Sequence, residues 1–225
     1  MINAAPVLIR YVIIRIISYL LGSLSFSIII SRIAFKDDIR NYGSGNAGMT
    51  NVLRTFGRSA AVFTFIGDFL KGLVSVFIAR AVMSGGAFAS AVLPDKLEFF
   101  LRTGLYIAAA GALVGHLKPV FFDFKGGKGV SVTFGALMAI NPIHVLMAAA
   151  VFGLTVLFSR IVSLASILAA ASYALITIAM YYINGNVLLP DIIAAIIFPG
   201  VIIYAHRSNI KRLLNGTEYK FGQKK

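Results

Sequence analysis

The chain has 225 residues, of which 59% are hydrophobic and 13% are charged, and its mean hydropathy is +0.88. A soluble globule of this length cannot bury so much apolar side chain, because its surface is too large relative to its core. In a soluble protein, the formal net charge of +13 would suggest binding to nucleic acid. In a membrane protein, basic residues that flank spans on the cytoplasmic side and contact anionic lipid account for it. The chain has no Cys, which excludes disulfides, thiolate metal sites and a cysteine nucleophile.

The apolar runs predict an all-α integral membrane protein, a polytopic bundle of about seven transmembrane helices forming one domain over residues 1–225. The uncharged run at 129–158 is too long for one span, and Asn141-Pro142 breaks it into a short helix and a full span. The first run lacks a small-residue cleavage site, so it is expected to be a retained span. In chain order the predicted segments are 7–31, 59–83, 103–117, 129–140, 142–158, 162–183 and 187–205.

The distribution of basic residues predicts the orientation. With seven crossings and the N-terminus outside, 15 basic residues lie on the inner side and 5 on the outer side, and the C-terminus is cytoplasmic. If residues 129–158 formed a single crossing, the basic tail would fall outside, so the charge bias favours the broken interpretation. The most polar segments then share the cytoplasmic face and could converge at one mouth of the bundle.

A first polar segment, at residues 43–54, reads Gly-Ser-Gly-Asn-Ala-Gly-Met-Thr-Asn-Val-Leu-Arg. Its three glycines free the backbone to turn N–H groups inward as an anion-binding nest, and a helix that begins near Thr50 would add a favourable dipole. Ser44, Asn46 and Thr50 offer further donors, and Arg54 could clamp a phosphate through two parallel hydrogen bonds. The alternative is a flexible loop with a capping Thr, and composition does not decide between them.

A second segment, at residues 115–130, reads Gly-His-Leu-Lys-Pro-Val-Phe-Phe-Asp-Phe-Lys-Gly-Gly-Lys-Gly-Val. Lys125 and Lys128 bracket a glycine pair ahead of an apolar helix, which again combines a nest with positive charge and suits phosphate. The alternative is a basic turn at the membrane surface, but two lysines and three glycines within five residues exceed what a turn needs. His116 could accept a proton near neutral pH or could cap its helix.

A third segment, at residues 206–218, follows the last span and reads His-Arg-Ser-Asn-Ile-Lys-Arg-Leu-Leu-Asn-Gly-Thr-Glu. Its later half predicts an amphipathic helix on the membrane surface, whereas His206 and Asn209 share one helix face and could point into a site. Ser163 and Ser166 could reach the same mouth, although Ser in a membrane helix more often bonds its own backbone.

Asp68 and Lys71 lie inside the second predicted span at i and i+3. Ionisable groups in such a position are costly, so they are expected to pair, as structural support or as support for a site.

Together these segments resemble the acyl-phosphate:glycerol-3-phosphate acyltransferase family of bacterial membranes. The family pattern is a Gly-Ser-Gly-Asn-Pro-Gly-Ala-Thr-Asn-Val-Leu-Arg segment, a Gly-His…Phe-Lys-Gly-Gly-Lys-Gly-Val segment and a C-terminal His-Arg-x-Asn-Ile-x-Arg-Leu-Leu segment followed by Gly-x-Glu. The chain has all three in order, with Gly-Asp-Phe-Leu-Lys-Gly at 67–72 and Val-Ser-Leu-Ala-Ser at 162–166, and the likeness runs essentially end to end. Ala47, Met49 and Lys118 depart from the pattern, which affects loop rigidity and acyl-chain preference more than chemistry.

The resemblance implies an enzyme that transfers a fatty acyl group from an acyl phosphate to the 1-hydroxyl of sn-glycerol 3-phosphate. The products are 1-acylglycerol 3-phosphate (lysophosphatidic acid) and phosphate, in the first committed step of phospholipid biosynthesis. It implies no cofactor and no metal. The expected partners are the two small-molecule substrates and membrane lipids, not nucleic acid, and the protein is expected to be a monomer in the cell (inner) membrane with its active site facing the cytoplasm.

The resemblance also assigns the site residues. The first segment and the Lys125–Lys128 loop are expected to hold the acyl phosphate, and Arg54, His206 and Asn209 the glycerol phosphate. The proton acceptor stays open between His116, His206 and the donor's own phosphate. The expected catalytic residues are Ser44, Lys128 and His206. The expected substrate-binding residues are Gly45, Asn46, Gly48, Thr50, Arg54, His116, Lys125, Gly126, Gly127, Ser163 and Asn209.

Three other classes of protein fit the sequence less well. A transporter of phosphorylated metabolites would share glycine-broken helices and intramembrane charge, but no internal repeat is visible and the polar segments crowd one face. A phosphatidyl transferase of the CDP-alcohol type needs an Asp-rich metal motif, and the acidic residues here are scattered. Acyltransferases of the soluble or thioester-using kind carry a His-x₄-Asp box, which this chain lacks.

Overall fold

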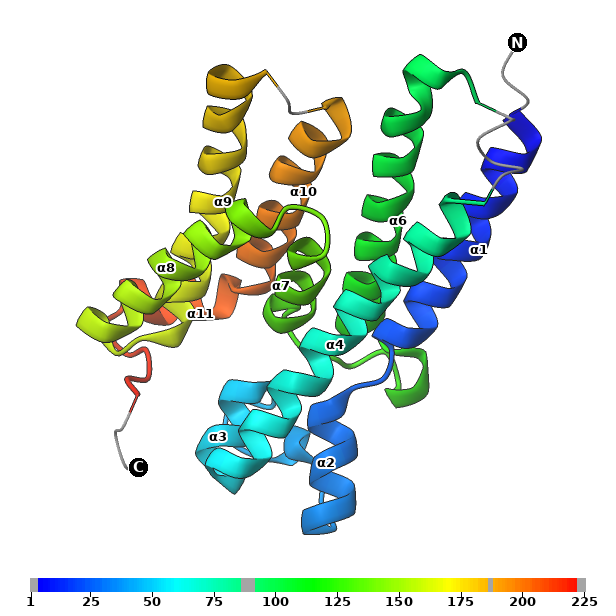
Figure 1. The fold of residues 1–225 in the computed structure, drawn as a ribbon. Coiled ribbons are helices and arrows are strands. Elements are labelled where there is room, and N and C mark those ends of the chain that lie inside the picture. Colours follow the sequence, from blue (N-terminus) through cyan, green and yellow to red (C-terminus); the bar gives the residue numbers. More distant parts are fainter. Residues whose placement is uncertain (1–3, 86–91, 186–187, 222–225) are drawn as a thin grey trace. The chain divides into compact units, whose positions relative to one another are not determined.

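Helices make up most of the computed structural model, which describes residues 4–85, 92–185 and 188–221 (Figure 1). The chain divides into two compact units, Met1–Ile140 and Asn141–Lys225. The first unit contains α1 (Ala4–Gly22), α2 (Phe26–Phe35), the 3-10 helix η1 (Ile39–Asn41), α3 (Met49–Phe56), α4 (Arg58–Met83), η2 (Pro94–Lys96), α6 (Leu97–Leu117), η3 (Val120–Phe122) and α7 (Val130–Met138). The second unit contains α8 (Pro142–Ser159), α9 (Val162–Asn184), α10 (Leu189–Ala205) and α11 (Arg207–Leu214). The described residues contain no strand, which confirms the all-α prediction.

Five described segments are long and apolar enough to cross a membrane, and α10 with α11 makes a sixth if this pair, bent by 62°, is one span. The protein is therefore a multi-pass membrane protein. The nine residues of α7 extend about 14 Å, less than the hydrocarbon thickness of about 30 Å, and α7 is not among the candidate spans. The predicted count of about seven spans thus stays a prediction. The five segments are Ala5–Phe35, Arg58–Met83, Pro94–Phe122, Pro142–Ser159 and Val162–Ile183.

Two predicted boundaries were wrong, and one predicted break is confirmed. The segment predicted at 7–31 extends to Phe35 and is broken after Gly22 into α1 and α2. The α6 helix begins at Leu97, six residues early, because Arg102 pairs with Glu98 one turn before it at 2.9 Å and supports a charged first turn. The break at Asn141-Pro142 is present, with α7 before it and α8 after it.

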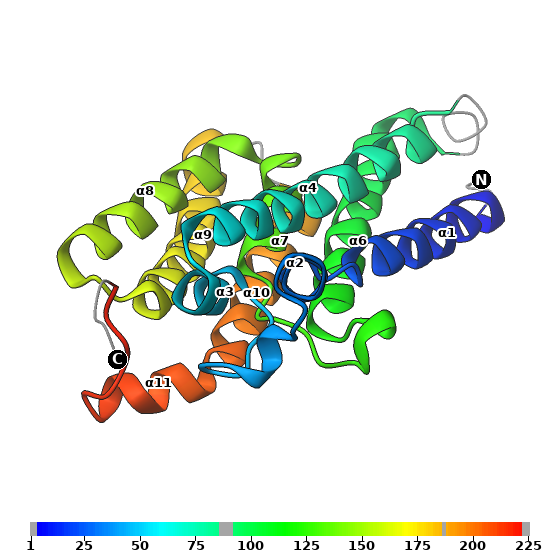
Figure 2. The same cartoon turned by 90° about the horizontal axis from the view of Figure 1, so that it is seen from below.

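Glycines let the helices of the first unit approach closely. The helices α1 and α6 run side by side, and α4 packs on α7 (Figure 1, Figure 2). A Cβ atom added at Gly22 would collide with the backbone of Ala112, and one added at Gly115 would collide with the carbonyl of Tyr19. Contacts of this kind replace the hydrophobic driving force, which is weak between helices in lipid.

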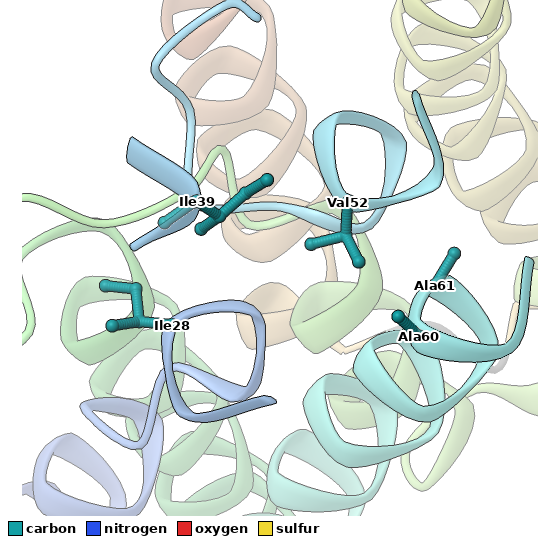
Figure 3. Packing of buried hydrophobic residues seen from close by; sticks show 6 residues of the cluster. Ile28, Ile39, Val52, Ala60 and Ala61 are labelled. Carbon is teal, nitrogen blue, oxygen red and sulfur yellow. The ribbon is translucent and has the colours of Figure 1, made fainter. Parts of the chain in front are cut away.

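A small apolar cluster of the first unit fixes its polar segment in place. Ile28 of α2, Ile39 of η1 and Val52 of α3 are fully buried, and they pack with Ala60 and Ala61 at the start of α4 (Figure 3). Because α3 is anchored in this cluster, the segment that precedes it is held at both ends.

In the second unit, α9 packs against α8 on one side and α10 on the other. Polar side chains link these helices: His144 Nδ1 lies 3.2 Å from Thr177 Oγ1, and Asn141 donates to Asp191 at 3.2 Å. Asp191 also accepts from the backbone N–H of Leu188 at 2.9 Å, which caps α10.

The crossing of α4 and α7 can be tested at Gly72, where an added Cβ would collide with the carbonyl of Val132. Gly72→Ala is expected to lower the free energy of unfolding by about 1–3 kcal/mol through overpacking. Gly153→Ala in α8 is the matched control, since nothing lies within 4 Å of its added Cβ. Helix propensity should there leave the protein equally or slightly more stable. Thermal unfolding in detergent measures both, and equal unfolding temperatures for the two variants would contradict the close crossing.

Candidate active site

The first glycine loop, residues 43–48, is shaped by the buried side chain of Asn51 on α3. Its Nδ2 donates to the carbonyls of Tyr42 and Ile39 at 2.9 and 3.2 Å, and its Oδ1 accepts from the backbone N–H of Ser44 at 3.1 Å. Gly43 and Gly45 adopt left-handed backbone conformations, with φ of +56° and +69°. The loop is thus a tight, internally bonded turn, and the alternative of a flexible loop does not describe it.

The predicted nest is only partly available to an anion. The backbone N–H groups of Ser44, Gly45 and Gly48 already donate within the segment. The helix α3 begins at Met49, which confirms the predicted start near Thr50, and its first N–H groups lack intrahelical acceptors. Donors for an anion therefore come from the end of the loop and the first turn of α3.

The second glycine loop, residues 123–129, is folded back on His116. The backbone N–H of Gly127 donates to the His116 carbonyl at 3.1 Å. A Cβ atom added at Gly126 would collide with that carbonyl, and one added at Gly127 would collide with both His116 Nε2 and the Ala47 carbonyl. The glycine pair is therefore needed for the close approach of this loop to His116. These contacts also bring the two glycine loops together beside His116.

Ionic contacts join the segments that precede the two glycine loops. Asp38 binds the guanidinium groups of Arg40 and Arg32 at 2.9 and 2.8 Å. Arg40 also donates to the carbonyl of Phe122 at 2.9 Å, and Arg32 lies over the Phe122 ring at 5.6 Å. Burial acts to raise the pKa of the Asp38 carboxyl, but the hydrogen bonds from Arg40 and Arg32 outweigh it and lower that pKa to about 2.

The predicted pairing of Asp68 with Lys71 is confirmed, and it includes a third residue. Lys71 Nζ lies 2.7 Å from Asp68 Oδ1 and 3.0 Å from His116 Nδ1, and it also donates to the Leu24 carbonyl at 2.7 Å. All three ionisable side chains are buried, at 1–5% exposure. The pair therefore supports the residue on which the second glycine loop packs.

In the second unit, the carboxylate of Glu218 accepts hydrogen bonds from side chains of the third polar segment and from α9. It accepts from Ser163 at 3.0 Å and Asn209 at 2.8 Å, and it pairs with Arg212 at 2.7 Å. Burial acts to raise the pKa of Glu218, and these hydrogen bonds outweigh it and lower the pKa below its ordinary value. Asn51 and Glu218 were not among the predicted site residues, although each makes several hydrogen bonds that hold its polar segment in shape.

His206 lies buried between α10 and α11, and its Nδ1 is 2.8 Å from the carbonyl of Ile202. A carbonyl only accepts, so Nδ1 carries the proton and, in the neutral ring, Nε2 has the lone pair. Ser166 donates to the carbonyl of Val162 at 2.9 Å, as predicted for a serine that bonds its own helix, whereas Ser163 turns to Glu218.

The first unit therefore brings together two of the three predicted segments. The predicted residues of those two segments are Ser44, Gly45, Asn46, Gly48, Thr50, Arg54, His116, Lys125, Gly126, Gly127 and Lys128. The side chains of Ser44, Arg54 and Lys125 are exposed, and those of Asn46, Thr50 and Lys128 are half-buried. His206, Asn209 and Ser163 belong to the second unit, and the convergence of all three segments stays a prediction.

Comparison with known proteins gives one consistent result. A family model described as glycerol-3-phosphate acyltransferase matches residues 12–216. The chain is 42% identical to the glycerol-3-phosphate acyltransferase of Clostridioides difficile (strain 630) over 96% of this chain and 97% of the relative. It is 37% identical to that of Bordetella pertussis over 100% of this chain and 98% of the relative.

Solved structures agree with these relatives. The fold matches the crystal structure of PlsY (YgiH), an integral membrane glycerol 3-phosphate acyltransferase, in its glycerol 3-phosphate form. The TM-score is 0.78, with 36% identity over 94% of this chain and 96% of that one. The lysophosphatidic acid form of PlsY matches with a TM-score of 0.75, 34% identity, and coverage of 94% and 95% of the two chains.

Removing the Asn51 side chain tests the shape of the first glycine loop. Asn51→Ala deletes three hydrogen bonds in a buried place and should cost roughly 2–4 kcal/mol of local stability. The loop should then open, so trypsin should cut at Arg40 or Arg54 at least tenfold faster in limited proteolysis. Asn215→Ala, at the exposed end of α11, is the control. An unchanged cleavage rate in Asn51→Ala would contradict the proposed bracing.

The Asp38 bridge predicts a pH dependence. Because the folded-state pKa of about 2 lies below the ordinary value of 3.8, ionised Asp38 contributes stability above pH 4 that is lost as pH falls through 2. Asp38→Asn should lower the free energy of unfolding at pH 7 by about 1–2 kcal/mol. The difference from the natural protein should narrow between pH 4 and pH 2 in thermal unfolding. The same change at exposed Asp95 should have no such effect, and a gap that widens in acid would refute the bridge.

Proposed function

The chain belongs to the glycerol-3-phosphate acyltransferase family, and on that basis we propose that its acyl donor is an acyl phosphate. The fatty acyl group moves to the 1-hydroxyl of sn-glycerol 3-phosphate, and the products are 1-acylglycerol 3-phosphate and inorganic phosphate. The hydroxyl oxygen forms the new ester bond to the carbonyl carbon, the bond from that carbon to the phosphate oxygen breaks, and the hydroxyl proton goes to an acceptor. An acyl phosphate is already activated, so positioning can supply much of the acceleration.

The observation that carries the proposal is the meeting of the two glycine loops at Ala47 and Gly127 beside His116. Backbone donors at the start of α3 and the cations Lys125 and Lys128 come from these loops, and such groups suit the phosphate and the developing oxyanion. In this proposal Ser44 and Lys128 contact the reacting acyl phosphate. The other residues predicted to bind it are Gly45, Asn46, Gly48, Thr50, His116, Lys125, Gly126 and Gly127.

The residues that the sequence predicts to bind the glycerol phosphate are Arg54, His206 and Asn209, and Ser163 is a further predicted substrate-binding residue. His206 is a suitable proton acceptor, since its Nδ1–H is directed to the Ile202 carbonyl and its Nε2 carries the lone pair. Glu218 orients Ser163 and Asn209 through its hydrogen bonds. The donor's phosphate oxygen is the alternative acceptor.

The proposed topology has seven crossings, an outer N-terminus and a cytoplasmic C-terminus. The excess of 15 basic residues on the inner side over 5 on the outer side supports it. In this topology α7 counts as one of the seven crossings and reverses the direction of the chain, although it has only nine residues. The active site accordingly faces the cytoplasm from the inner membrane, where a soluble phosphate ester and a lipid-like donor can both reach it. The chain acts as a monomer and as one catalytic domain over residues 1–225.

The donor class can be measured as phosphate release by purified protein in detergent with palmitoyl phosphate and glycerol 3-phosphate. Palmitoyl-CoA serves as a parallel donor, and EDTA is present throughout. Release should require both substrates and fail with the CoA donor, and Lys128→Ala should lower kcat/KM by roughly 10²–10³-fold. Lys96→Ala, an exposed lysine of η2, is the control.

The other outcomes of this assay would indicate a different acyl donor or a different function. Turnover with palmitoyl-CoA alone would overturn the proposed donor. No turnover by folded protein that still binds glycerol 3-phosphate would favour a transporter of phosphorylated metabolites.

A further inference from the structure

The buried side chains of Asp68, Lys71 and His116 form a chain of contacts that ends at the glycine loops. Lys71 has three ammonium protons and three close oxygen or nitrogen neighbours: Asp68 Oδ1, the Leu24 carbonyl and His116 Nδ1, at 2.7, 2.7 and 3.0 Å. An ammonium group has no lone pair and can only donate. His116 Nδ1 therefore accepts, and the proton of the neutral imidazole is on Nε2.

The opposite tautomer is inconsistent with the same geometry. It would require Nδ1–H to donate to Asp68 Oδ1 at 3.5 Å, the longer of the two contacts. It would also direct this N–H at the Lys71 ammonium, 3.0 Å away, so that two donors face each other without an acceptor. Asp68 and Lys71 are the ionisable groups in contact with the imidazole.

The Nε2 edge of His116 lies where the two glycine loops meet. A Cβ atom added at Gly127 would collide with Nε2 on one side and with the Ala47 carbonyl on the other. Within residues 4–85 and 92–140 of this unit, no group accepts a hydrogen bond from Nε2, although the ring is only 3% exposed. A ligand oxygen at this point can accept the hydrogen bond that no other described group of this unit accepts from Nε2–H.

We propose that Asp68 and Lys71 are positioning residues that hold His116 as an Nε2–H donor to a phosphate oxygen of the substrate at the junction of the two glycine loops. His116 is then a hydrogen-bond donor in acyl transfer and not the proton acceptor. This inference rests on the proposed function for the identity of the ligand, but the tautomer of His116 does not depend on it. His206, with its proton on Nδ1, has the opposite tautomer.

The tautomer can be read directly by ¹⁵N NMR of the full chain in detergent, with ring-labelled histidine. The protein has three histidines, and the His116 signals are those that disappear in His116→Gln. At pH 7 the His116 ring should show a protonated Nε2 and an unprotonated Nδ1. Lys71→Met, which removes the donor to Nδ1, should shift the ring toward the other tautomer or a mixture. A protonated Nδ1 in the natural protein, as neutral ring or imidazolium, would overturn the proposal even if every Lys71 variant failed to fold.

Two amide substitutions separate the roles of the two ring nitrogens in the acyl-transfer assay. The amide of Gln reaches the position of Nε2 and can still donate there, whereas the amide of Asn reaches only the position of Nδ1. His116→Gln should lower kcat/KM clearly less than His116→Asn does, with an unchanged pH profile, and His116→Asn should lower it by roughly 10- to 100-fold. His144→Gln, the same change in the second unit, is the matched control.

The outcomes distinguish this inference from the proposed function. Equal loss of activity in folded His116→Gln and His116→Asn, or the disappearance of one limb of the pH profile in His116→Gln, would show that His116 exchanges a proton and would refute a donor role. A natural protein with the expected tautomer but no acyl transfer would refute the proposed function alone. The phosphate oxygen as ligand would then fail with it, while the assignment of the Asp68–Lys71–His116 chain would stand.

Discussion

A broken helix inside a membrane leaves a backbone carbonyl that water cannot reach, and the first unit depends on how this carbonyl is satisfied. The break between α1 and α2 releases the carbonyl of Leu24, and the Lys71 ammonium donates to it. The same ammonium pairs with Asp68 on its own helix and with His116 near the end of α6. One buried charge therefore joins three helices, and removing one partner would leave the other charged and unpaired.

The sequence allowed those parts of the fold to be predicted whose cause is local. Asn141-Pro142 ended α7 and began α8 because proline restricts the residue before it, and Asp68 and Lys71 paired because i and i+3 lie on one helix face. The break after Gly22 could not be predicted in this way. Nothing in that run prohibits a continuous helix, and the contacts that stabilise the break, such as Lys71 to Leu24, come from residues far along the chain.

For the candidate site, the segments could be identified from the sequence, but the role of each residue in them could be predicted less well. The glycines of the second loop were expected to form a nest, yet Gly126 and Gly127 are small because His116 lies against them. Asn51 and Glu218 were missed because each was one polar residue among many in its segment. A signal for Glu218 existed, since it is the one carboxylate in a strongly basic tail, and its three partners needed an acceptor.

The Asp38 bridge changes how much positive charge the first polar segment presents to a phosphate. Arg32 and Arg40 count among the inner basic residues, yet they share the single negative charge of Asp38, and Arg40 is also bound to Phe122. Their contribution is to hold the shape of the loop through contacts near 3 Å, which mobile ions screen little. Attraction of a dissolved anion acts over a Debye length and weakens as salt is added. Added salt should therefore weaken the attraction of the dissolved substrate while it leaves the short contacts of Asp38 and the shape of the loop unchanged.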